Sequence, residues 1–162
     1  MLIISNKAKV SPLADVEDSV KGSKIVIEEG VVIDSFVKIK AAGGLGDVYI
    51  GPFTVINSGT VIYVGNGVTI GRNVSIASNC TIAPTNHEIL KKGVIIQKQA
   101  FMPSRGGIII EDDVWIGANT VLLDGAILRH GCVIGAASLV RSEVQAYSIN
   151  VGNPLRLIRY RE

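Results

Sequence analysis

The chain has 162 residues, of which 48% are hydrophobic and 5% aromatic, and its formal net charge is +2. This length fits one domain, spanning residues 1–162, and so small a charge gives no reason to expect a nucleic-acid partner. The sequence contains no apolar run of about 18 residues, as a membrane span requires, and the opening residues MLIISNKAKVSP lack a signal-peptide pattern. We therefore expect a cytoplasmic protein without a transmembrane segment.

An apolar residue recurs every six positions along most of the chain. A six-residue period fits neither a helix nor simple strand alternation, and it is the signature of a parallel β-helix. A weaker echo of the period occurs near the N-terminus, at Val16 and Val20. The recurring residues are, in chain order, Ile27, Ile33, Ile39, Ile50, Ile56, Ile62, Ile70, Ile76, Ile82, Ile110, Ile116, Leu122, Leu128, Ile134 and Val140.

Each hexad predicts one short strand and one corner. Alternate side chains of a strand face opposite ways, so the first and fifth residues of a hexad both point inward. Three hexads close a triangular coil, and coils must stack because none can bury its inner face alone. Glycine at the second position, as at Gly51 and Gly117, suits a close backbone approach at a corner. We expect about six coils and a column ~30 Å tall, at ~4.8 Å per coil.

The single tryptophan and the two cysteines fall on opposite sides of the expected strands. Trp115 takes an outward position, where a large ring indicates a subunit interface or a ligand. Cys80 and Cys132 take inward positions at least two coils apart, too far for a disulfide. We expect both cysteines to be small buried fillers.

Two short interruptions of the period, AAGGLGDVY after Ile39 and VGNGV near residue 65, are rich in glycine. We interpret both as structural corner loops without a function. A much longer insertion separates Ile82 from Ile110, so residues 83–109 must leave the column as a loop. An insertion of this length is more often functional than idle.

The long insertion carries His87 at its base, in an outward position. Histidine exchanges protons near neutral pH, so His87 is a candidate general base. The other histidine, His130, lies in a corner with nothing distinctive nearby, and we assign it no role.

The repeat fades after Val144, and residues 145–162 are expected to cap the last coil. A predicted turn at Gly152-Asn153-Pro154 precedes three arginines, Arg156, Arg159 and Arg161. Two interpretations stay open: the arginines are surface charge on a lid, or they form with Arg141 a basic cluster that holds phosphates.

The segment IIIEDDVWIGANTVLLDGAILRHGCVIGAASLVRSEV, followed by GNPLRLIR, resembles the C-terminal half of the hexapeptide-repeat acetyltransferases. It is most similar to the sugar O-acetyltransferases of the galactoside, maltose and polysaccharide-modifying kind. The resemblance implies an all-β fold, a left-handed parallel β-helix with a protruding loop and a short C-terminal cap, which is an exception to the usual right-handed crossover. It also implies a homotrimer that binds acetyl-CoA between adjacent columns.

The resemblance further assigns roles to individual residues. The catalytic histidine of the family corresponds to His87, and an asparagine that contacts the acceptor sugar corresponds to Asn57. Independently of the resemblance, the outward position of Trp115 leads us to expect that it contacts substrate. An acidic acceptor-binding residue of the galactoside and maltose enzymes corresponds to Gly65, which argues against those simple acceptors. The expected coenzyme contacts are Ala118, Ala136, Arg141, Ser142, Arg156 and Arg159.

These residues predict an acetyl-CoA-dependent O-acetyltransferase that acts on a sugar or saccharide hydroxyl, such as a cell-surface polysaccharide or a glycan precursor. His87 is expected to deprotonate the hydroxyl for direct attack on the thioester, with no nucleophilic side chain and no metal. Two alternatives stay open, N-acetylation of a nucleotide-linked amino sugar and a non-catalytic scaffold. A zinc-dependent carbonic anhydrase is disfavoured because it would need three histidines, and the chain has two.

Overall fold

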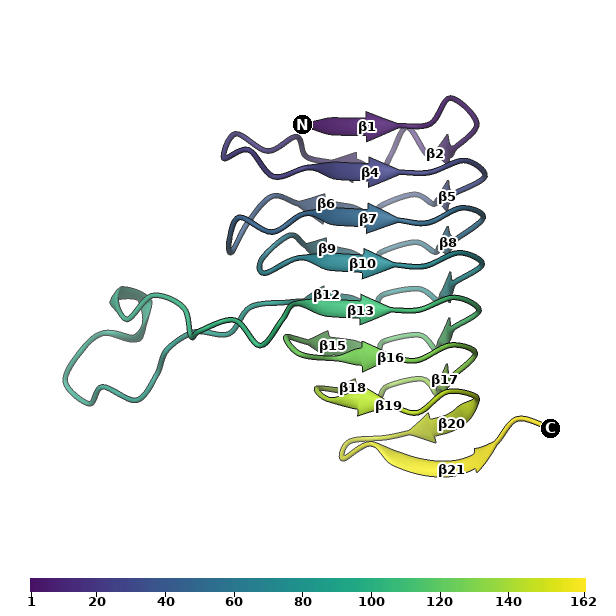
Figure 1. The fold of residues 1–162 in the computed structure, drawn as a ribbon. Coiled ribbons are helices and arrows are strands. Elements are labelled where there is room, and N and C mark those ends of the chain that lie inside the picture. Colours follow the sequence, from purple (N-terminus) through teal and green to yellow (C-terminus); the bar gives the residue numbers. More distant parts are fainter.

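The computed structural model describes residues 1–162 as a column of stacked triangular coils (Figure 1). Three sheets, here called A, B and C, form its walls. Sheet A contains β1 (Leu2–Ile4), β4 (Ile25–Ile27), β7 (Val48–Ile50), β10 (Val68–Ile70), β13 (Ile108–Ile110), β16 (Ile127–Leu128) and β19 (Glu143–Val144). Sheet B contains β2 (Lys9–Val10), β5 (Val32–Ile33), β8 (Val55–Ile56), β11 (Ser75–Ile76), β14 (Trp115–Ile116), β17 (Val133–Ile134), β20 (Ser148–Val151) and β21 (Arg156–Tyr160). Sheet C contains β3 (Asp15–Val16), β6 (Lys38–Lys40), β9 (Val61–Tyr63), β12 (Thr81–Ala83), β15 (Val121–Leu123) and β18 (Leu139–Val140).

Neighbouring coils pair in parallel, and their register places the recurring apolar residues directly over one another. In sheet A, Ile50 pairs with Ile70, and Ile70 pairs with Ile110 although the insertion separates them in sequence. The predicted parallel β-helix is therefore confirmed. The long insertion leaves the register of the coils unchanged.

The interior of the column is one cluster of 28 buried hydrophobic residues. Burying an Ile, Leu or Val side chain contributes about 1.5–3 kcal/mol, so the stacked apolar ladders supply most of the stability. Threonines in the inward fifth position are also buried, and their hydroxyls donate to carbonyls of the next coil, as Thr54 does to Gly71 at 2.8 Å. The predicted echo at Val20 is wrong, because that side chain is 99% exposed.

Glycines at the second position of a hexad permit close stacking of the corners. A Cβ on Gly117 would lie 2.5 Å from the backbone nitrogen of Ala136, and one on Gly51 would lie 2.6 Å from the carbonyl carbon of Gly71. Backbone atoms of a stacked coil cannot easily move aside. The expected close approach is therefore present at these corners.

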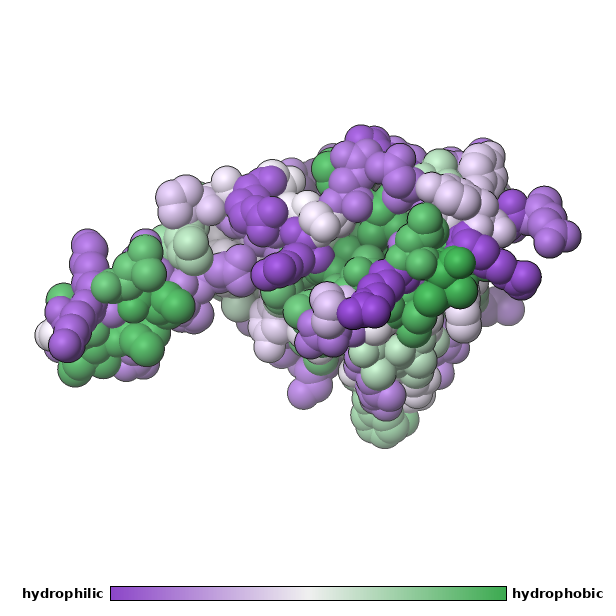
Figure 2. All heavy atoms as spheres, turned by 90° about the horizontal axis from the view of Figure 1, so that it is seen from below, coloured by the Kyte–Doolittle hydropathy of each residue, from purple (hydrophilic) through white to green (hydrophobic).

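Residues 84–107, between β12 and β13, leave the column as an arm that contains the short 3-10 helix η1 (Ile96–Lys98) (Figure 1). Seen from the C-terminal end, the arm projects sideways and carries apolar side chains at its tip (Figure 2). At the end of the chain, β21 pairs antiparallel with β20 and covers the last coil, so the protruding loop and the C-terminal cap are both present. No helix has the length and hydropathy that crossing a membrane requires. The exposed apolar residues of the tip are Ile89, Leu90, Val94, Ile95 and Ile96.

Candidate active site

His87 lies in the neck of the arm, just beyond β12, and its side chain is exposed. An isolated antiparallel bridge joins it to Phe101 on the returning strand of the arm, and the two ring centroids are 4.8 Å apart. Backbone hydrogen bonds flank the bridge, with the Met102 nitrogen donating to the Asn86 oxygen at 2.8 Å. The backbone of the neck and the Phe101 ring therefore position the imidazole.

A cavity of about 340 Å³ opens beside His87, at the corner where the chain passes from sheet C to sheet A. Its walls come from three stacked coils and from the arm. Segments far apart in the sequence thus meet at one place. The lining residues are Ala42, Gly43, Tyr63, Ala83, Thr85, His87 and Phe101.

The two short glycine-rich loops, which we interpret from the sequence as structural corner loops, both lie at this corner of the column. The first loop forms part of the cavity wall through Ala42 and Gly43. Gly43 and Gly65 also lie next to the first root of the arm, the segment around Thr85 where the chain leaves the column. A Cβ on either glycine would come within 2.8 Å of the Thr85 hydroxyl oxygen. Both interruptions follow the third hexad of a coil, as the long insertion does, and this shared position was the overlooked signal.

Asp124, which no sequence pattern singled out, holds the second root of the arm, residues 105–107, where the chain returns to the column. This side chain is 2% exposed and follows β15 in the same corner. It accepts hydrogen bonds from the backbone nitrogens of Arg105 at 2.7 Å and Gly107 at 2.9 Å. The side-chain amide of Asn66, in the second glycine-rich loop, donates to it at 3.2 Å. Asp124 therefore ties the arm to two neighbouring loops.

The predicted acceptor contacts lie elsewhere on the column. Trp115 is on β14 in sheet B with 48% of its surface exposed. Asn57 follows β8 at the corner between sheets B and C, and its amide donates to the Ile76 oxygen at 2.8 Å. A single chain thus does not bring either residue to His87.

The predicted coenzyme contacts are distributed around the C-terminal end of the column. Ala118 and Ala136 stack at the corner between sheets B and C, where the Ala137 nitrogen donates to the Ala118 oxygen. Arg141 and Ser142 line a separate cavity of about 310 Å³ together with cap residues 153–155.

The arginines of the cap do not form one cluster. Arg156 begins β21 and pairs with Val151, whereas Arg159 pairs with Ile149 nearer the other end of that strand. Arg161 forms an ion pair with Asp113 at 2.9 Å. The proposed basic cluster that would unite these side chains with Arg141 is therefore not present in one chain.

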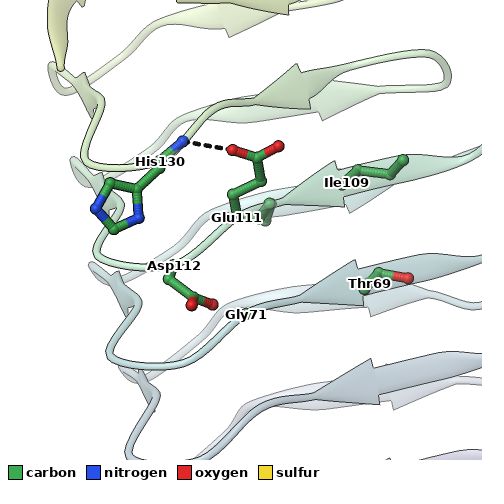
Figure 3. Close-up of a pocket in the computed structure, with 7 residues that line it drawn as sticks. Thr69, Gly71, Ile109, Glu111, Asp112 and His130 are labelled. Atoms are coloured by element: carbon green, nitrogen blue, oxygen red, sulfur yellow. Dashed lines mark hydrogen bonds between the residues drawn. The ribbon is translucent and has the colours of Figure 1, made fainter. Parts of the chain in front are cut away.

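His130 has more distinctive surroundings than the sequence suggested. It lines a cavity of about 310 Å³ at the corner between sheets A and B, shown in Figure 3 with Glu111 and Asp112. Its backbone nitrogen donates to the Glu111 carboxylate at 2.7 Å, and its ring meets the Tyr147 ring edge-on at 5.3 Å. A hydrogen bond from Arg129 lowers the pKa of Glu111. These contacts connect neighbouring coils and lie away from the arm.

Both cysteines are free and buried, as predicted. Burial raises the pKa of the Cys80 thiol, and it raises that of Cys132 to about 12. Neither thiol is therefore suited to act as a nucleophile. No group of three or more His, Cys, Asp or Glu side chains is arranged to hold a metal ion.

Comparison with known proteins gives a local match to a family model and a likeness of fold. Residues 107–142 match the family model described as bacterial transferase hexapeptide (six repeats). A chloramphenicol acetyltransferase of Klebsiella aerogenes is 43% identical over 56 residues, which are 35% of this chain. The matched segment spans 27%, about a quarter, of the length of that relative.

Two solved structures resemble nearly the whole column. A single-residue mutant of AntD, an N-acyltransferase from Bacillus cereus, in complex with dTDP and coenzyme A has a TM-score of 0.82 at 23% identity, covering 99% of this chain and 84% of that one. The polySia-specific acetyltransferase NeuO has a TM-score of 0.75 at 25% identity, covering 98% and 71%. Residues 107–142 are thus similar to the hexapeptide-repeat family, and the predicted left-handed β-helix fold is confirmed.

Proposed function

We propose that the chain is an acetyl-CoA-dependent acetyltransferase in which His87 is the general base. The observation that carries this proposal is the exposed imidazole at the base of the arm, in the wall of a cavity large enough for a small molecule. The similarity to an N-acyltransferase crystallised with coenzyme A, and to two acetyltransferases, supports the same reaction class.

In the proposed reaction, His87 removes the proton of an acceptor hydroxyl as its oxygen attacks the thioester carbonyl carbon. The C–S bond then breaks, and the imidazolium returns the proton to the departing thiolate. General-base assistance of this kind contributes about 10²–10⁴-fold. Holding both substrates in reacting geometry supplies much of the rest. Neither buried cysteine takes part.

The proposed acceptor is a sugar or saccharide hydroxyl, such as one on a polysaccharide or its precursor, and the proposed location is the cytoplasm. The name of NeuO, a polySia-specific acetyltransferase, supports a glycan acceptor. A second candidate is N-acetylation of a nucleotide-linked amino sugar. It is favoured by the likeness to AntD, an N-acyltransferase solved with dTDP.

For the coenzyme, we propose contacts from Ala118 and Ala136 and from the polar residues at the end of the column. Two observations support this assignment. Arg141 and Ser142 line an open cavity beside the cap, and the Arg156 and Arg159 side chains are exposed, so that they are free to meet phosphates. Substituting Arg141 and Arg159 by alanine should weaken acetyl-CoA binding, whereas a scaffold protein would bind no acetyl-CoA at all.

We further propose that the site is completed in a homotrimer. His87 lies at the corner of sheets C and A, while Trp115 and Asn57 lie on sheet B or its edge. They can serve one site only if two columns face each other. Five exposed apolar residues at the arm tip also lack a partner within the chain, which supports packing against a neighbour. Light scattering should give about three times the chain mass, and a stable active monomer would contradict the shared site.

The reaction itself is tested by following thiol release from acetyl-CoA against a panel of sugars, oligosaccharides and nucleotide-linked amino sugars. Product mass and base stability separate an ester from an amide, and hence O- from N-acetylation. Turnover with at least one saccharide acceptor is expected. Absence of both acetyl-CoA binding and turnover would favour the scaffold alternative.

A further inference from the structure

A break in side-chain size on the outer face of sheet C lies next to His87. Three positions follow one another along the column at the ends of β9, β12 and β15, and they hold Tyr63, Ala83 and Leu123. Ala83 pairs directly with Leu123, and Ile82 pairs with Ile62, the residue before Tyr63. The small side chain between two large ones leaves a notch, and this notch is part of the cavity beside the imidazole.

The walls of the cavity carry no acidic side chain, lysine or arginine. The rings of Tyr63 and Phe101, which are 38% and 48% exposed, provide two aromatic surfaces. The polar groups available are the Tyr63 phenol, the Thr85 hydroxyl and the His87 imidazole. Lys40, which pairs with Tyr63 in the sheet, forms an ion pair with Asp15, so it adds no free charge nearby.

We propose that this cavity receives the acceptor ring whose hydroxyl is acetylated, that this ring is uncharged, and that Ala83 sets the room available to it. The inference rests on the proposed function and narrows its substrate class. A volume of about 340 Å³ falls within the ~300–1,000 Å³ typical of small-molecule sites. Aromatic faces suit the apolar C–H face of a sugar ring, and hydroxyl groups suit its polar rim.

Charge on the reacting ring would be unfavourable in this cavity. A carboxylate or phosphate brought here would exchange water for a wall that contains no lysine or arginine. Rings of the uronic or sialic type are therefore disfavoured as the acetylated unit. Charged parts of a larger acceptor, such as a nucleotide or a neighbouring sugar, must lie outside the cavity.

The test uses Ala83→Leu, which fills the notch with the side chain already present at position 123. For the best acceptor found in the thiol-release panel, kcat/KM should fall at least tenfold through a higher KM, with the Kd for acetyl-CoA within twofold of the wild type. Thr81→Leu on the same strand is the matched control, because Thr81 does not line the cavity. Equal kcat/KM for Ala83→Leu and the wild type would overturn the proposal.

A second measurement tests binding of a sugar ring in the cavity without requiring catalysis. Saturation-transfer NMR compares methyl glucoside with methyl glucuronide, which differ by a carboxylate. The wild type should transfer saturation more strongly to the glucoside, and Ala83→Leu and Tyr63→Ala should each reduce that transfer. Equal or stronger transfer to the glucuronide, or no effect of both variants, would overturn the inference. If instead the wild type acetylates nothing in the panel while these NMR results hold, the proposed reaction fails and the neutral sugar site stands.

Discussion

Asp124 offers the sharpest test of how the arm is held to the column. Its carboxylate accepts two backbone N–H groups from the returning root of the arm, at 2.7 and 2.9 Å. The Gly107 oxygen in turn accepts from the Gly125 nitrogen at 2.7 Å, so the two segments are joined in both directions. Replacing Asp124 by alanine removes the first set of bonds and leaves the second.

The expected cost follows from the burial of the donors. The Gly107 N–H is buried and would lose its partner, which costs about 1–3 kcal/mol. The Arg105 N–H is less buried and can donate to water instead, so loss of its bond to Asp124 adds about 1 kcal/mol. Together these give about 2–4 kcal/mol of local stability for Asp124→Ala. Asp124→Asn keeps the shape and one acceptor oxygen, so a smaller loss is expected.

Hydrogen exchange at the arm root measures this loss directly. At about 1.4 kcal/mol per tenfold change, protection at Gly107 should fall by about 30- to 700-fold in Asp124→Ala. Asp34→Ala is the matched control, because Asp34 is exposed and its carboxylate accepts only the adjacent Ser35 nitrogen. Unchanged protection at Gly107 would refute the assignment of Asp124 as the tie between arm and column.

Three further predictions concern the column. Gly117→Ala should lower the free energy of unfolding by about 1–3 kcal/mol in denaturant titration, because its Cβ would meet the Ala136 nitrogen at 2.5 Å; an unaltered midpoint would contradict the close approach. Cys80 and Cys132 should not react with a disulfide reagent at pH 8 until denaturant is added, because both are buried. The folded-state pKa of both thiols is raised, so the free energy of unfolding should fall as pH rises above the unfolded-state pKa of about 8.5. The pKa of Glu111 is lowered, so its contribution to the free energy of unfolding is present above about pH 4.3 and is lost as pH falls through the folded-state pKa. Glu111→Gln should remove at most about 1 kcal/mol of the stability difference between pH 7 and pH 3, because the ion pair with Arg129 is partly exposed. A variant that loses more stability in acid than the wild type would contradict this prediction.

The fold was predictable because the repeat constrains every inward side chain. Ile70 and Ile110 keep one register across the insertion, and each must fill the same narrow interior. The prediction failed at Val20, in the irregular first coils, where the segment leaves the column and the side chain faces solvent.

The candidate site was predictable only in part. The position of His87 follows from counting hexads to the base of the insertion, and the structure places it beside a cavity. Tyr63, Ala83 and Asp124 carried no such signal, because the repeat constrains the inward side chains and does not fix the residue type at these outward and corner positions. Their proximity arises from stacking of coils, which joins residues that are distant in the sequence.

The central claim is that the imidazole of His87 deprotonates the acceptor. With the best acceptor from the panel, kcat should fall by two or more orders of magnitude in His87→Ala, with the Kd for acetyl-CoA little changed. His130→Ala, at the only other histidine, is the matched control and should retain wild-type kcat. Wild-type turnover in His87→Ala would remove this residue from the mechanism.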